Sequence, residues 1–109
     1  MIKRKTVINS ETMMNGKVEI KLLGFFGKAY GSNKVTLEIS GASNLREIIK
    51  RLVDSSEDLK RVLIDPVLES PLPNSVILVN NKDISALRGL ETPVMNGDKI
   101  VIIPVIHGG

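Results

Sequence analysis

The sequence contains no cysteine, a single histidine and only three aromatic residues. The absence of thiols excludes disulfides, thiolate-held zinc, iron–sulfur clusters and a cysteine nucleophile. The histidine, His107, would give an imidazole-based catalytic triad one candidate base with little to orient it. Phe25, Phe26 and Tyr30 are too few to form an aromatic platform on which nucleic-acid bases stack.

Long apolar runs are also missing, because no stretch approaches the roughly 20 apolar residues that a membrane-spanning helix requires. There is no signal-peptide pattern, and the carboxylates lack the spacing of metal ligands. No segment combines a nucleophile, a base and oxyanion donors. We therefore expect a soluble, cytoplasmic, monomeric protein that binds no metal, cofactor or membrane and is not itself an enzyme.

Positive charge is concentrated at the start of the chain. Residues 1–16 carry Lys3, Arg4 and Lys5 against Glu11, and so hold most of the formal net charge of +3. This polar, weakly periodic segment is predicted to be a flexible arm. Three basic side chains are few compared with the phosphate contacts of nucleic-acid binders, so direct nucleic-acid binding is not expected. A passive binding module that touches RNA through the arm stays open as an alternative.

Regular elements are predicted after the arm. Apolar and polar residues alternate in VEIKLLGFF (18–26) and KVTLEIS (34–40), which predicts two strands. The intervening segment 27–33 is rich in glycine, serine and asparagine and is predicted to be a turn. Two strands joined by so short a connection form a hairpin.

Helices are predicted in the middle of the chain. Asn44 with Glu47 three residues later is close to a capping box, and apolar residues at helical spacing predict a helix over 45–54. A second, weaker helical turn is predicted over 57–63. The three prolines of 65–74 predict a loop.

The last third of the chain predicts two further long strands, at 75–80 and 99–105, with the turn NGD (96–98) before the second. The order strand, strand, helix, strand, short strand, strand predicts an α+β fold of the β-grasp type. Its mixed sheet of four to five strands would pack on one main helix. We expect a single domain over 17–104 and a flexible tail over 105–109.

The segment VNNKDISALRGLETPVMNGDKIVIIPVIHGG (79–109) resembles the closing segment of the ubiquitin-like sulfur carriers. This family includes the small subunit of molybdopterin synthase, the thiamine-pathway carrier, the ubiquitin-related modifier and the small archaeal modifier proteins. The shared features are VN at the end of a strand, NGD before the last strand, a proline near its end and a final Gly-Gly. The HGG ending and the long region between helix and third strand favour the ubiquitin-related modifier.

The resemblance implies chemistry at the carboxylate of Gly109. An activating enzyme that consumes ATP would adenylate it, and sulfur transfer would then give a thiocarboxylate, a sulfur donor for example in tRNA thiolation. Alternatively, lysines of target proteins would take the acyl group as an isopeptide. Gly108 and Gly109 would let the backbone pass through a narrow channel, and Pro104 would end the last strand. A role as the small subunit of molybdopterin synthase, in molybdenum cofactor biosynthesis, remains an alternative.

The resemblance also implies an apolar patch near the tail that docks the activating enzyme and the sulfur-accepting enzyme. The corresponding positions here are Phe25, Ile84 and Ile103, although the family often has an aromatic residue in the last strand. The alternation itself predicts apolar side chains on both faces of the sheet, more than one helix covers, and exposed apolar patches often mark binding surfaces. His107 is expected to serve recognition by a partner rather than catalysis.

Overall fold

The computed structural model describes residues 15–106 of the chain. Five strands form one mixed sheet in the order β2-β1-β7-β4-β5. They are β1 (Asn15–Leu22), β2 (Lys34–Ser40), β4 (Ser75–Val79), β5 (Lys82–Asp83) and β7 (Lys99–Pro104). β1 and β7 run parallel, and the other neighbouring strands run antiparallel. Two short strands, β3 (Ser43–Asn44) and β6 (Pro93–Val94), pair separately.

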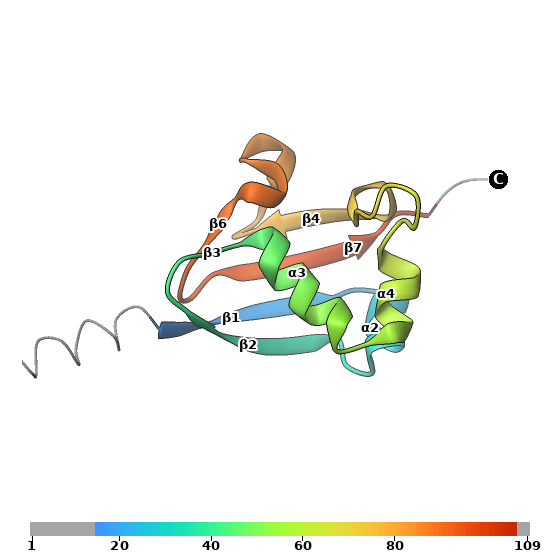
Figure 1. The fold of residues 1–109 in the computed structure, drawn as a ribbon, viewed down its shortest axis with the longest axis horizontal. Coiled ribbons are helices and arrows are strands. Elements are labelled where there is room, and N and C mark those ends of the chain that lie inside the picture. Colours follow the sequence, from blue (N-terminus) through green and yellow to red (C-terminus); the bar gives the residue numbers. More distant parts are fainter. Residues whose placement is uncertain (1–14, 107–109) are drawn as a thin grey trace, which may run out of the picture.

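One main helix, α3 (Leu45–Asp54), crosses a single face of this sheet (Figure 1). The shorter helices are α2 (Phe25–Tyr30) and α4 (Glu57–Leu63), and three 3₁₀ turns complete the connections: η1 (Leu72–Asn74), η2 (Ile84–Ala86) and η3 (Gly89–Glu91). This mixed sheet around one main helix is a β-grasp fold, so the predicted fold class is confirmed. Within residues 15–106, no helix is long and apolar enough to cross a membrane.

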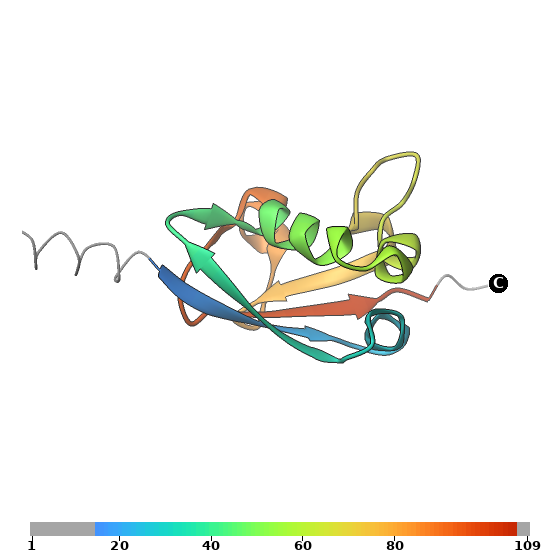
Figure 2. The ribbon, with the colours of Figure 1, turned by 60° about the horizontal axis from the view of Figure 1, so that its bottom comes forward.

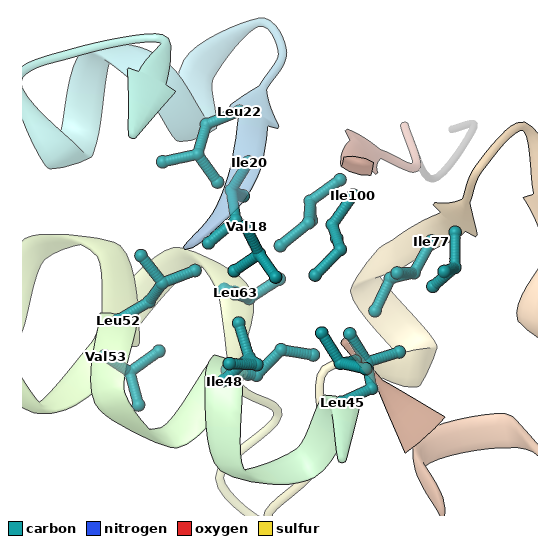
Figure 3. Close-up of a cluster of buried hydrophobic side chains, with 14 of the residues drawn as sticks. Val18, Ile20, Leu22, Leu45, Ile48, Leu52, Val53, Leu63, Ile77 and Ile100 are labelled. Carbon is teal, nitrogen blue, oxygen red and sulfur yellow. The ribbon is translucent and has the colours of Figure 1, made fainter. Parts of the chain in front are cut away.

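The core lies between α3 and the sheet face that α3 covers (Figure 3). Side chains alternate between the two faces of a strand, so every second residue of β1 points into the core. Apolar residues of α3 meet them at helical spacing. The labelled members are Val18, Ile20, Leu22, Leu45, Ile48, Leu52, Val53, Leu63, Ile77 and Ile100. Burying a side chain of this size stabilises the fold by about 1.5–3 kcal/mol before the entropy cost.

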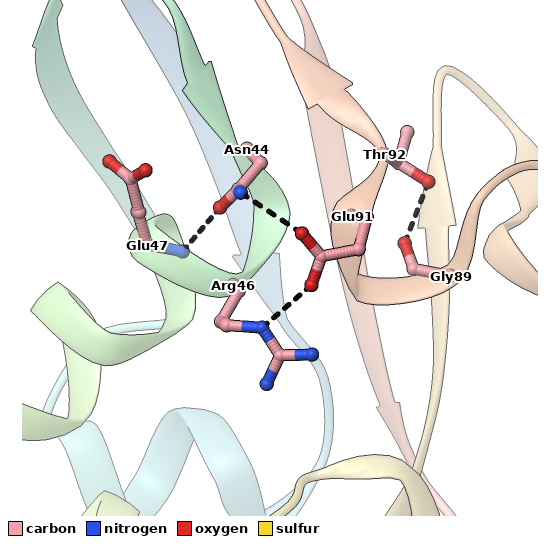
Figure 4. Close-up of polar contacts among 6 residues, drawn as sticks. All are labelled: Asn44, Arg46, Glu47, Gly89, Glu91 and Thr92. Atoms are coloured by element: carbon pink, nitrogen blue, oxygen red, sulfur yellow. Dashed lines mark hydrogen bonds and ion pairs between the residues drawn. The ribbon is translucent and has the colours of Figure 1, made fainter.

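A polar network fixes the start of α3 (Figure 4). The Asn44 side-chain oxygen accepts a hydrogen bond from the Glu47 backbone N–H at 3.0 Å. This contact satisfies one of the donors that the first helical turn leaves free. The Asn44 amide nitrogen lies 3.5 Å from the Glu91 carboxylate, which also accepts from Arg46 Nε at 2.9 Å. The network therefore ties the helix start to η3.

Residues 25–30 form a helix where the sequence predicted the end of a strand and a turn, so that prediction was wrong. β1 ends at Leu22, and Gly24 then takes φ +55°, a conformation that residues with side chains rarely adopt. Within the helix, a Cβ added at Gly27 would lie 2.7 Å from the Leu22 carbonyl oxygen. These glycines serve a chain reversal and a close approach, which glycine content alone does not separate from a turn.

The remaining boundaries agree closely with the sequence predictions. Both predicted helices and the second strand have the predicted bounds. The arm predicted over 1–16 is too long at its end, because Asn15 and Gly16 pair with β2 as part of β1. Residues 1–14 lie outside the described residues, so the flexibility expected for them stays a prediction.

We predict that Asn44→Ala lowers the free energy of unfolding by about 1 kcal/mol, because the first turn of α3 loses its side-chain acceptor. Asn44→Ser is the matched control: it keeps a capping oxygen and should recover most of the loss. Urea unfolding monitored by circular dichroism measures both. Equal losses in the two variants would show that the Glu91 contact, rather than the cap, stabilises this end.

Candidate functional site

Figure 2 shows α3 and α4 on one side of the strands, so that the described residues leave the opposite face of the sheet uncovered. We call this the open face. Across β1, the start of β2 and the start of β7 the open face is charged: Glu19 and Lys34 form an ion pair at 3.0 Å, with Lys21 and Lys99 nearby. The hydrogen bond from Lys34 lowers the pKa of Glu19. This half of the open face is therefore a solvated, polar surface.

Toward the end of β7 the open face becomes apolar. Val76 lies opposite Ile103 and Leu78 opposite Val101 in the antiparallel register of β4 and β7. Residues opposite each other share a face, so these four side chains form one apolar strip. Leu23 adjoins the strip, because its N–H donates to the carbonyl of Ile102 in β7 at 3.0 Å. We call the following set the apolar patch: Leu23, Phe25, Val76, Leu78, Val101 and Ile103.

Helix α2 separates two neighbouring phenylalanines. Phe26 is completely buried in the core, whereas Phe25 is 45% exposed. Their rings meet edge to face with centroids 5.1 Å apart, so the buried ring supports the exposed one. Gly24, with its positive φ, is the residue before the helix, and the two phenylalanines are the first residues of the helix. An exposed aromatic side chain anchored in this way is a typical contact for a protein partner.

The chain leaves the fold beside Phe25. Pro104 ends β7 against Gly24, where an added Cβ would lie 3.1 Å from Pro104 Cγ. The Val105 N–H donates to the Asn74 carbonyl at 3.0 Å, and Ile106 is then 84% exposed. The chain is therefore held at Pro104 and Val105, between the start of α2 and η1. We call this point the tail exit.

The structure separates the site residues predicted from the sequence. Phe25 follows Gly24 and Ile103 precedes Pro104, so both lie next to the contact between Gly24 and Pro104. Ile84 does not, because it begins η2 and is only 4% exposed, packed in the core. Its expected place on a docking surface is therefore corrected. His107, Gly108 and Gly109 lie outside the described residues, so their assigned roles stay predictions.

Sequence reasoning did not single out Val76 and Leu78. The run SVILV is apolar throughout, which hides which residues face outward. In the structure Ile77 and Val79 are buried while Val76 is exposed and Leu78 half-buried. The serine at the start of the run, Ser75, is buried like Ile77 and Val79, so the alternation was present but masked.

A small hollow of about 170 Å³ reaches the patch at Val101, and its other lining residues are mostly polar, such as Glu19 and Lys21. Within residues 15–106, no three His, Cys, Asp or Glu side chains gather as metal ligands. The larger hollow, of about 740 Å³, lies on the helix side between α3, α4 and the following loop. Its rim is charged, and its apolar lining includes Ile49, Val53 and Pro71. The candidate site is therefore the apolar patch together with the tail exit.

Comparisons with known proteins agree with this arrangement. The sequence matches the ThiS family over residues 20–109. Among solved structures, it is similar to the small archaeal modifier protein 1 (SAMP1) from Methanosarcina acetivorans, at 29% identity and a TM-score of 0.73, covering 87% of this chain and 98% of that chain. The Amycolatopsis orientalis BexX/CysO complex contains a chain at 27% identity and a TM-score of 0.65, with coverages of 84% and 99%. Urm1 from Trypanosoma brucei is 20% identical with a TM-score of 0.67, and the match covers 87% of this chain and 97% of that chain. No curated protein matches the sequence.

We predict that Gly24→Ala lowers the free energy of unfolding by about 1–3 kcal/mol, because alanine is strained at this positive φ and its Cβ presses on Pro104. Gly31→Ala is the matched control. Gly31 also has a positive φ, of +97°, but an added Cβ would meet nothing within 4 Å. Chemical denaturation measures both variants. A loss at Gly24 no larger than that at Gly31 would show that the contact with Pro104 contributes nothing.

Proposed function

Because this chain belongs to the ThiS family, and so to the ubiquitin-like sulfur carriers, we propose that the carboxylate of Gly109 is the group on which it carries sulfur. An activating enzyme would dock on the apolar patch and receive the tail. One observation carries the proposal: the exposed Phe25 and the half-buried Ile103 lie beside the exit of the segment that leads to Gly109. An apolar surface at that position suits a partner that takes the tail.

The proposed reaction has two steps. A carboxylate oxygen of Gly109 attacks the α-phosphorus of ATP, forming an acyl adenylate and releasing pyrophosphate. A sulfide-level nucleophile then attacks the acyl carbon, AMP leaves with the electron pair of the broken C–O bond, and a thiocarboxylate remains. The activating enzyme supplies the ATP site and the sulfur. The carrier supplies a rigid body to be gripped and a tail that enters another protein's active site.

The thiocarboxylate or adenylate can then have more than one fate. We propose that the chain serves as a modifier and sulfur donor, for example in tRNA thiolation or by conjugation to lysines. This choice is supported by the 29% identity to a small archaeal modifier protein. Co-purification with a large catalytic subunit of molybdopterin synthase would instead assign it to molybdenum cofactor biosynthesis.

We predict that removal of Gly108 and Gly109 abolishes ATP–pyrophosphate exchange by the activating enzyme, because no correctly placed carboxylate remains. The full chain, purified from its native cells under conditions that limit hydrolysis, should show the mass gain that replaces one oxygen by sulfur. Heavier species joined through Gly109 to lysines would demonstrate conjugation. If no activating enzyme of those cells adenylates the full chain, the proposed function is wrong.

We predict that Phe25→Ala raises the Michaelis constant of the carrier in the same exchange assay by about tenfold, with kcat unchanged, because an anchoring aromatic contact is lost. Met95→Ala is the control, since Met95 is also exposed, at 63%, but precedes the turn far from the tail exit. Thermal unfolding confirms that both variants fold. An unchanged Michaelis constant for Phe25→Ala would remove the ring from the docking surface.

A further inference from the structure

Exposed apolar side chains concentrate at one end of the molecule. Within residues 15–106, nine large apolar side chains are exposed, and only Leu87 and Met95 lie away from the end where β7 finishes. Those at the tail end are Leu23, Phe25, Val67, Leu68, Leu72, Val76 and Ile106. Three of these seven belong to the connection between α4 and β4, which stands out from the fold at the tail end (Figures 1 and 2). We call this connection, residues 64–74, the α4–β4 loop.

The tip of the α4–β4 loop is apolar and held in shape. Val67 is 86% exposed and Leu68 65%. The Asp65 side-chain oxygen accepts the N–H groups of both residues, at 3.0 and 2.8 Å. The Asp65 N–H donates to the Ser70 carbonyl at 2.8 Å, and the Asp65 carbonyl accepts from the Glu69 N–H at 2.7 Å. The six residues 65–70 thus close a hydrogen-bonded loop that presents two apolar side chains.

The α4–β4 loop combines one strained backbone conformation with two exposed apolar side chains. Glu69 has φ +53°, which costs a non-glycine residue on the order of 1 kcal/mol. The exposed Val67 and Leu68 gain little from burial in the folded chain. A preorganised apolar tip lowers the entropy cost of binding another protein.

The base of the α4–β4 loop is joined to the tail exit. The Asn74 side chain donates to the Leu63 carbonyl at 3.1 Å, which fixes the loop to α4. The Asn74 carbonyl accepts the Val105 N–H at 3.0 Å, which fixes the same residue to the start of the tail. Leu72, which is 48% exposed, lies two residues before Asn74 in the chain. Apolar surface therefore flanks the tail exit on the loop side as well as on the side of α2.

The length of the tail limits which partner reaches both sides. Residues 105–109 span at most about 17 Å beyond Pro104. An enzyme that reacts with Gly109 must bring its active site within that distance of the exit, so its body approaches this end of the carrier. A second copy of the chain, in contrast, has no need to approach the tail exit.

We propose that the α4–β4 loop is a second docking element, whose tip side chains Val67 and Leu68 enter an apolar hollow of the activating enzyme. The enzyme holds the carrier on both sides of the tail, by the apolar patch and by the loop tip. This inference rests on the proposed function. It adds a contact that selects this carrier among other chains with a Gly-Gly ending, since the loop is a long connection with its own apolar tip.

The test compares the double variant V67S/L68S with wild type in ATP–pyrophosphate exchange by the activating enzyme. The Michaelis constant of the carrier should rise about tenfold with kcat unchanged, as expected when apolar contact residues are truncated. The matched control is L87S/M95S, which removes two exposed apolar side chains away from the tail exit and should match wild type. Asp65→Ala keeps the apolar tip but removes its acceptor, and a smaller rise is expected from the loss of preorganisation.

The outcomes separate this inference from the proposed function. A full chain that no activating enzyme adenylates overturns both. Normal adenylation of wild type, with an equal Michaelis constant for V67S/L68S, overturns the loop contact alone. Sedimentation of wild type and V67S/L68S, with thermal unfolding, completes the test. If wild type self-associates and the double variant does not, the tip is a contact between copies and the inference is overturned.

Discussion

The positions of the apolar patch and the tail exit depend on the parallel pairing of β1 with β7. Lys21 lies beside Val101 and Leu22 beside Ile102, so the first and last long strands run together through the middle of the sheet. Because the two strands are parallel, both finish at the same end of the sheet. The chain reversal after β1 and the tail after β7 therefore meet, and the contact of Gly24 with Pro104 is the consequence.

The same architecture explains why apolar surface is available at that end. A single layer of helices covers one face of the sheet, yet β4 and β7 are apolar on both faces. At the outer edge of β2, side chains occupy backbone groups of the strand. Arg51 donates to the Glu38 carbonyl at 2.7 Å, and the Ser32 hydroxyl donates to the Lys34 carbonyl and accepts from the Lys34 N–H. Side chains that occupy edge groups oppose strand addition by other chains. Exposure is thus concentrated on a face near the tail rather than on an edge.

Sequence reasoning succeeded where structure is determined locally. The cap at Asn44 and the helical spacing after it give the bounds of α3, because both signals lie within one turn or a few turns. It failed at α2. There Gly27 packs against the end of β1 and Gly24, with its positive φ, packs against the end of β7, and these contacts are not visible in the local sequence. The prediction that Ile84 lies on a docking surface was wrong for a related reason: in a 3₁₀ turn of three residues, no periodicity of the sequence indicates which side meets the core. Phe25 is exposed as expected, although the segment predicted as a strand over 18–26 ends at Leu22 and Phe25 begins a helix.

The chemistry proposed for the tail would require that recognition come from the folded body. Gly108 and Gly109 carry no side chains, so an enzyme that reads only these residues meets the same backbone in every chain with this ending. Discrimination is a difference of affinities between the correct carrier and its competitors, and it needs groups in which they differ. Those groups must lie within reach of the tail exit, where Pro104 and Val105 are fixed to the fold. Under the proposed function, the folded body therefore selects the partner, and the two glycines let the carboxylate enter the partner's active site.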